Sequence, residues 1–132
     1  MIERELYIGR WHADFLFSDG NYDDELVLTR LYDIDAPIYI MQEVNRLMDS
    51  CDANCGFTYT NPEMFEALVV VGPTTSGDEF VDTLVHEVHH LAVAIADSLD
   101  IDLESETPAY IAGDSARELA GVVCKFGCDR CN

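Results

Sequence analysis

Positive charge is scarce in this sequence. Only seven lysines and arginines stand against 26 aspartates and glutamates, so the formal net charge is -19 at pH 7. A field of this sign repels nucleic-acid phosphates and anionic membranes, and we expect neither as a partner. A basic partner, a divalent cation, a high-salt habitat or solubility alone remain as explanations of the charge.

Long apolar runs are missing as well. The first ten residues, MIERELYIGR, carry charges where a secretory signal needs an apolar segment. No apolar run approaches the roughly 18 to 20 residues of a membrane-spanning helix. The five cysteines are an odd number, which argues against a fully paired disulfide framework and suits a reducing compartment. These absences predict a soluble, cytoplasmic protein.

Hydrophobic residues nevertheless make up 48% of the chain, which suffices for a core at a length of 132 residues. No internal repeat or linker is visible, so we expect residues 1–132 to form a single domain. Two apolar-rich runs, 5–17 and 25–34, flank the turn-forming residues 18–21. This arrangement predicts a β-hairpin at the start of the chain.

A helix is expected next. Asp35 is a typical N-cap residue, Pro37 suits a first helical turn, and apolar residues recur at helical spacing to about residue 49. Residues 57–60 and 65–72 have the composition of two further strands. The second of these either offers a sheet edge to which an extended peptide adds as a new strand, or lies inside the sheet.

The C-terminal half predicts two more helices. Thr75 or Ser76 is expected to begin the first, which should run to about Leu99. After an acidic loop, Ser105 and Pro108 are expected to open the second. The predicted order is β-β-α-β-β-α-α, an α+β fold in which a small sheet packs on helices.

The first of these helices contains the segment HEVHH. On a helical wheel, His86 and His90 lie about 40° apart, and Glu87 lies about 60° beyond His90. Histidines at i and i+4 enclosing a glutamate form the HExxH arrangement, in which the imidazoles bind a metal and the glutamate is the general base. The alternative is that His86 and His90 are histidines of the core that bind no metal. His89 is expected to be either exposed or part of the core. The residues expected to fill the core from the opposite face are Leu84, Val85, Val88, Leu91, Ala92 and Ile95.

The HEVHH motif on an apolar helix after a small sheet resembles the zincin metallopeptidases. A downstream acidic residue in place of a third histidine makes the chain similar to their glutamate-liganded branch, in particular to the very short bacterial and phage-encoded HExxH proteins. The extended HExxHxxGxxH pattern of the metzincins is absent. The resemblance implies a zincin-like fold, a catalytic zinc ion and hydrolysis of a peptide or protein substrate.

A catalytic zinc usually has three protein ligands and an open position. In the families that the chain resembles, a second helix donates a glutamate, often with an aromatic residue one turn later. Glu106 followed by Tyr110 fits this pattern, with Glu104 and Glu118 as alternatives. The alternative is that Glu106 binds no metal and is simply a carboxylate at the start of a helix, where it interacts favourably with the helix dipole. Tyr110 and His12 are candidates for stabilising an oxyanion, although Tyr110 is equally suited to a core. For His12, whose place in the fold the sequence does not define, a role without catalysis is preferred.

The implied mechanism is zinc hydrolysis. The metal would lower the pKa of its water towards about 7, and Glu87 would take the proton and pass it to the leaving amine. The second hypothesis is a non-catalytic zincin-like module, in which the metal stabilises the fold and the chain binds a partner. The small size of the chain supports it, since little room is left for substrate subsites.

The cysteines offer a second site for zinc. Their CxxxC and CxxC spacings are those of structural zinc ligands, and four of the five could tie the chain's end to the loop after the first helix. Free thiols or one or two disulfides are the alternatives. A cysteine-held zinc with an empty HExxH motif is the third hypothesis. The residues concerned are Cys51, Cys55, Cys124, Cys128 and Cys131.

Overall fold

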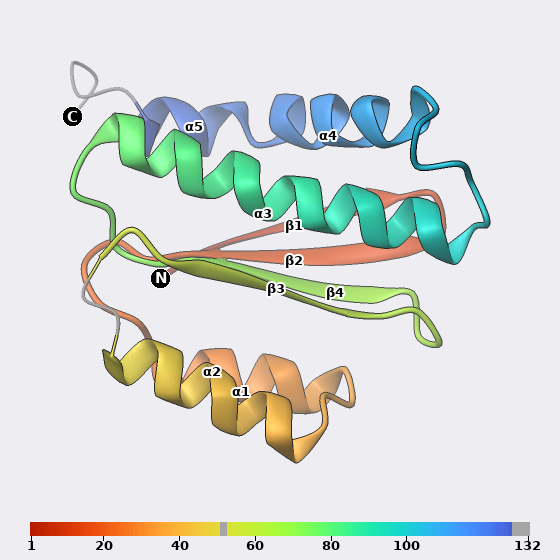
Figure 1. The fold of residues 1–132 in the computed structure, drawn as a ribbon. Helices are drawn as coiled ribbons and strands as arrows, with labels where there is room; N and C mark the ends of the chain where they lie inside the picture. The colour runs from red at the N-terminus through yellow and green to blue at the C-terminus, as the bar shows by residue number, and fades with distance from the viewer. Residues whose placement is uncertain (51–52, 128–132) are drawn as a thin grey trace.

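The computed structural model describes residues 1–50 and 53–127, and Figure 1 shows its fold. The elements in chain order are β1 (Ile2–Ile8), β2 (Trp11–Phe17), α1 (Asp24–Asp33), α2 (Ile38–Ser50), β3 (Gly56–Asn61), β4 (Glu66–Val71), α3 (Gly77–Ser98), α4 (Thr107–Glu118) and α5 (Ala120–Gly127). Four strands and five helices in the described part of the chain confirm the α+β class. No helix described there has the length and apolarity that a membrane span requires.

One mixed sheet holds the strands in the order β1-β2-β4-β3. β1 runs antiparallel to β2, β2 runs parallel to β4, and β4 runs antiparallel to β3. The central strands, WHADFLF and EALVVV, are apolar nearly throughout, as expected of strands covered on both faces. Of the two alternatives for the predicted strand 65–72, the interior one is therefore correct, and β3 lies at the edge.

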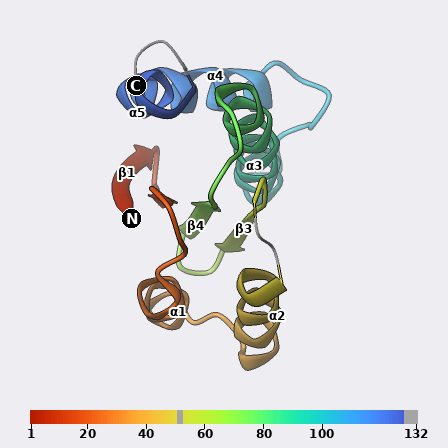
Figure 2. The same ribbon diagram turned by 90° about the vertical axis from the view of Figure 1, so that its left-hand side faces the viewer.

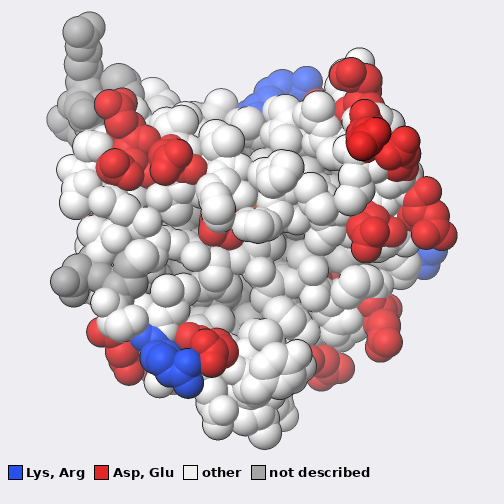
Figure 3. Space-filling view, in the orientation of Figure 1, with Lys and Arg blue, Asp and Glu red and all other residues white. Residues whose placement is uncertain are grey.

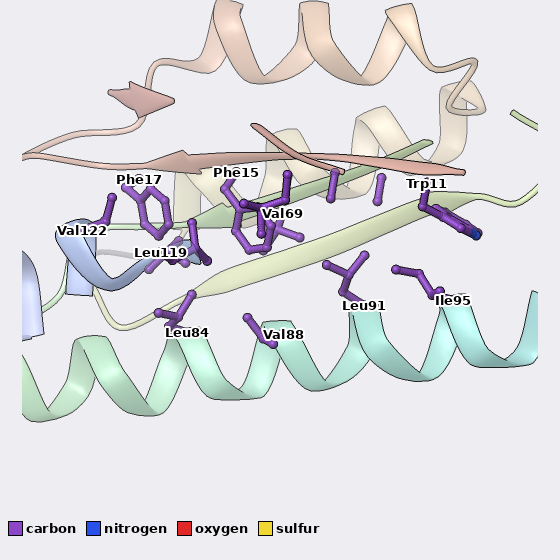
Figure 4. Packing of buried hydrophobic residues seen from close by; sticks show 14 of the residues in the cluster. Trp11, Phe15, Phe17, Val69, Leu84, Val88, Leu91, Ile95, Leu119 and Val122 are labelled. Carbon is purple, nitrogen blue, oxygen red and sulfur yellow. The ribbon is translucent and has the colours of Figure 1, made fainter. Parts of the chain in front are cut away.

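Helices cover both faces of the sheet (Figures 1 and 2). α3, α4 and α5 lie on one face, and α1 and α2 lie on the other. Alternate residues of the central strands serve each face. Phe15, Phe17 and Val69 belong to the core between the sheet and α3 (Figure 4), whereas Leu16 and Val70 belong to the core against α1 and α2. The sheet is thus the middle of three layers, and it fixes the orientation of α3.

The longest helix, α3, begins and ends where the sequence predicts. The side chain of Ser76 caps its first turn by accepting the N–H of Glu79 at 3.2 Å. At the other end Asp100 has a left-handed φ of 55°, and the N–H of Ile101 donates to the carbonyl of Ala96 at 2.9 Å. These are the features of a Schellman motif, which satisfies the last carbonyl groups of a helix.

Five of the six residues expected on the apolar face of α3 are buried, and Val85 is not. Val85 is 61% exposed. It lies about 80° from the centre of that face on a helical wheel, which places it beyond the reach of the sheet. The five buried residues are Leu84, Val88, Leu91, Ala92 and Ile95.

The predicted hairpin around residues 18–21 is wrong. The hairpin lies earlier, within the first apolar run, where Gly9 adopts a φ of 59° that favours glycine in the turn. The second run, 25–34, is helix α1. Asp23 caps α1 by accepting the N–H of Leu26 at 3.1 Å, and an aspartate at this position is a typical signal for the start of a helix.

The boundaries of two other helices also differ from expectation. Asp35 is not the N-cap of α2, since it has a left-handed φ of 58°. It ends α1 instead, where the N–H of Ala36 donates to the carbonyl of Leu31 at 3.0 Å, and α2 begins after Pro37. The last predicted helix does begin beside Pro108, but it divides at the buried Leu119 into α4 and α5. The order is therefore β-β-α-α-β-β-α-α-α.

Candidate functional site

His86 and His90 lie one turn apart on an exposed side of α3, as their spacing predicts. Their Nε2 atoms are 3.1 Å apart, within hydrogen-bond distance. The ring centroids are 4.7 Å apart, and the rings meet edge to face. The helix therefore brings two imidazole nitrogens to one point in front of its surface.

Glu87 is placed differently from the two histidines. It is only 4% exposed, between α3 and the edge strand β3. The hydroxyl of Thr58 on β3 donates to Oε2 of Glu87 at 2.7 Å and lies 3.1 Å from its backbone carbonyl. The other carboxylate oxygen, Oε1, is 4.0 Å from Nε2 of His86. One oxygen is thus held by the sheet while the other faces the histidine pair.

A glycine allows this close approach of strand and helix. A Cβ atom at Gly56 would come within 2.6 Å of the carbonyl oxygen of Val70 and 3.3 Å of Cγ of Glu87. The first of these distances is a clash with backbone, which cannot shift easily. A larger residue would clash with the backbone of β4 and crowd the side chain of Glu87, so Gly56 contributes to the position of this carboxylate.

These side chains line a cavity of about 440 Å³ between α3 and β3. Thr60 and Phe57 add to its wall from the strand, and Ala94 adds to it from the helix. A neighbouring hollow of about 280 Å³ shares Gly56, His86 and Glu87 with it. The site is therefore an elongated cleft along the sheet edge, with His86 and Glu87 at the junction of its two parts.

The described residues bring no third ligand to the pair. No group of three histidine, cysteine, aspartate or glutamate side chains in residues 1–50 and 53–127 could hold a metal ion. α4 contacts α3 and β1, so it flanks α3 on the side away from β3 (Figure 2). Glu106 lies exposed at the start of α4, and Glu104 and Glu118 are exposed as well. The third ligand stays a prediction.

The remaining predicted site residues lie outside the cleft. Tyr110 is 67% exposed on α4. His12 belongs to β2, where it lies on the α1 side of the sheet rather than the α3 side, because it alternates with Trp11 and Ala13 of the α3 core. His89 is exposed, as one alternative proposed, with its ring centroid 6.3 Å from that of His90.

The cysteines are described only in part. Cys55 is disulfide-bonded, and a sulfur in a disulfide is not a thiolate ligand at the same time. Cys124 is exposed on α5. The other three predicted ligands, Cys51, Cys128 and Cys131, lie outside the described residues. Zinc binding by the cysteines therefore remains a prediction, and for Cys55 it applies only when its disulfide is reduced to a thiol.

Thr58 and Gly56 are not among the site residues that the sequence predicts. Both belong to a segment that could be identified as a strand, but Thr58 is 29 residues from Glu87 in sequence. No local sequence pattern indicates the contact between Thr58 and Glu87, which can be predicted only from the order of the strands in the sheet.

Compared with known proteins, the chain matches no family model, no curated protein sequence and no solved structure.

Proposed function

We propose that this chain is a zinc-dependent peptide hydrolase whose active site is the cleft between α3 and β3. The observation that carries the proposal is the 3.1 Å separation of the Nε2 atoms of His86 and His90. Two nitrogens on a tetrahedral zinc at 2.0–2.1 Å are about 3.3 Å apart, so the pair fits such an ion with little movement. His86 and His90 are the residues that would hold it.

Glu87 is the proposed general base. A bound zinc ion would supply Lewis-acid chemistry towards the substrate carbonyl. Glu87 would accept a proton from the attacking water and deliver it to the leaving amine. Its position supports this role, because Thr58 holds Oε2 at 2.7 Å and leaves Oε1 facing His86. A buried carboxylate that is fixed on one side and open on the other is suited to proton transfer.

The proposed substrate is an extended peptide that pairs with β3. β3 is an edge strand of sequence GFTYTN, without a charged residue, and its α3 side lines the cleft. Uncharged sheet edges accept an added strand through backbone hydrogen bonds. The other edge, β1, carries Glu3, Arg4 and Glu5, which disfavour such pairing. A peptide on β3 would run past Glu87 and the two histidines.

The proposal is tested by hydrolysis of a quenched fluorescent peptide library in the presence of zinc. We expect cleavage that stops on addition of a chelator and returns with zinc. No cleavage of any library member by zinc-loaded protein would contradict the proposed activity.

Glutamine variants of Glu106, Glu104 and Glu118 test the predicted third ligand. We compare how much zinc each variant retains, and we expect Glu106→Gln to lose zinc most readily.

Thr58→Val tests how Glu87 is positioned. A hydrogen bond to a charged group contributes roughly 1.5–3 kcal/mol, so we expect kcat to fall about tenfold or more while KM changes little. Thr60→Val is the matched control, because Thr60 lines the same cavity but donates no hydrogen bond to Glu87. Equal kcat values in the two variants, with both folded by circular dichroism, would count against a positioning role for Thr58.

A non-catalytic metal-stabilised binding module is the second candidate. A catalytic zinc usually has three protein ligands. The candidates for the third ligand, Glu106, Glu104 and Glu118, are exposed, and no described carboxylate completes such a site, which favours this candidate over a catalytic one. In this case zinc would raise the melting temperature, and Glu87→Gln would leave partner binding unchanged. The peptide assay distinguishes the two candidates.

A further inference from the structure

A second polar cluster lies on the opposite face of the sheet, where β1, β2 and β4 meet α1. The strand register brings its members side by side: Glu5 pairs with Asp14 across β1 and β2, and His12 pairs with Glu66 across β2 and β4. They line a cavity of about 320 Å³. This volume is at the lower end of the range of small-ligand pockets, and the catalytic proposal makes no use of it.

His12 is held between two carboxylates in this cavity. Its Nδ1 is 2.6 Å from Oε2 of Glu66, and its Nε2 is 3.0 Å from Oε1 of Glu5. Burial lowers the pKa of His12, but the hydrogen bonds and charges of Glu66 and Glu5 outweigh burial and raise it. His12 is thus favoured as an imidazolium that neutralises part of the charge of its two neighbours.

Asp14 is the buried member of the cluster. It is 6% exposed, and its Oδ2 accepts the Nε–H of Arg30 at 3.1 Å. Arg30 also donates to both carboxylate oxygens of Glu3, at 3.0 and 3.3 Å. Oδ1 of Asp14 accepts no hydrogen bond, and it is the one buried side-chain nitrogen or oxygen atom of the described residues without a partner. A buried acceptor of this kind lacks a donor.

The charges around Asp14 define the kind of donor that fits. The carboxylates lining the cavity are Glu3 and Glu5 of β1, Asp14 of β2, Glu66 of β4 and Asp33 of α1, whereas the cationic groups are His12 and Arg30. This excess of carboxylates disfavours an anion. No three metal-ligating side chains of the described residues come together here, which disfavours a metal ion. A cation with several N–H donors satisfies both conditions.

We propose that this cavity binds an organic cation, a guanidinium or primary ammonium group that donates a hydrogen bond to Oδ1 of Asp14. Carboxylate pockets recognise guanidinium through paired N–H donors, as Arg30 already does with Glu3. The cavity volume accommodates the end of an arginine or lysine side chain, or a small free amine. The formal net charge of -19 gives the whole chain a field that attracts cations. Acidic side chains also far outnumber basic ones on the face drawn in Figure 3, although that is the side of β3 and α2 and not the side of this cavity.

A proton competes with the cation for Asp14. Burial and the neighbouring Glu3 carboxylate raise the pKa of Asp14 to about 7, and Arg30 opposes the shift. Below that pH the carboxyl is neutral, so binding of the cation must displace one proton. Affinity should therefore rise about tenfold per pH unit between roughly pH 5 and pH 7 and then level off.

Isothermal titration of the full chain tests the proposal. The probes are agmatine, an acetylated and amidated Gly-Arg-Gly peptide, and the same peptide with the neutral isostere citrulline. We expect the arginine peptide to bind with the stated pH dependence and the citrulline peptide not to bind. Binding of agmatine as well would identify free small cations as sufficient ligands, whereas binding of the peptide alone would identify the side chain of a basic protein segment. Both results agree with the proposal.

Matched variants locate the binding. Asp14→Asn should weaken it about tenfold or more, since a charged acceptor is lost. Glu5→Gln, at a position whose side chain is 56% exposed, should weaken it without threatening the fold. Glu79→Gln removes the same charge from the first turn of α3, which covers the opposite face, and should change nothing. Failure of both the arginine peptide and agmatine to bind at millimolar concentration, equal binding of the arginine and citrulline peptides, or unchanged binding by both Asp14→Asn and Glu5→Gln would overturn the proposal.

Discussion

Replacing Glu87 by glutamine should lower kcat for peptide hydrolysis by about 10²- to 10⁴-fold, the range for loss of a general base. Glutamine has the shape of glutamate, and its side-chain oxygen can still accept the hydroxyl hydrogen of Thr58, so the fold should persist. Zinc content should stay unchanged, since His86 and His90 are intact. The measurement is kcat on a peptide cleaved by the native chain, together with zinc per chain in each sample.

The control for this experiment is Glu79→Gln, which removes the same charge from an exposed position in the first turn of the same helix. Its kcat should equal that of the native chain. If Glu87→Gln cleaved the peptide at the native rate while holding zinc, Glu87 would not be the base, and the proposed mechanism would be wrong.

Replacing Leu91 by alanine should lower the free energy of unfolding by about 2–5 kcal/mol, the range for a large-to-small substitution in a core. Leu91 is fully buried between α3 and the sheet (Figure 4), and the residues just before it in the same helix include His86, Glu87 and His90. The loss is a large fraction of the roughly 5–15 kcal/mol that stabilises an ordinary domain. Chemical denaturation monitored by circular dichroism measures it.

Val85→Ala is the matched control, since Val85 belongs to the same helix but is 61% exposed. Its effect should stay within about 0.5 kcal/mol. A comparable loss of stability in both variants would mean that the sheet does not hold α3 through this face. The packing account of how the histidine helix is oriented would then fail.

The sequence was sufficient for those features of the site that are local. The apolar period of α3, the cap at Ser76 and the positions of His86 and His90 all follow from spacing within one helix. Strands 57–60 and 65–72 could likewise be identified from β-branched and aromatic composition. Such features depend on residues a few positions apart, so no knowledge of the tertiary structure is needed to find them.

Features that depend on distant partners could not be predicted. Thr58 contacts Glu87 only because β3 pairs with β4 at the sheet edge, and His12 meets Glu66 only because β2 pairs with β4 in parallel. The run 25–34 fits both a strand and a helix, and its burial against the sheet with the cap at Asp23 decides for the helix. Short apolar runs carry this ambiguity whenever tertiary contacts choose the element.

Zinc content of the native chain and of His86→Ala, measured by elemental mass spectrometry after zinc loading and removal of free metal, tests the central claim most directly. Loss of one imidazole from the pair should remove about one equivalent of zinc per chain relative to the native protein. His89→Ala, which removes an exposed histidine of the same helix, should retain the native content. Equal zinc in the native chain and in His86→Ala, or no zinc in either, would contradict a metal site on α3.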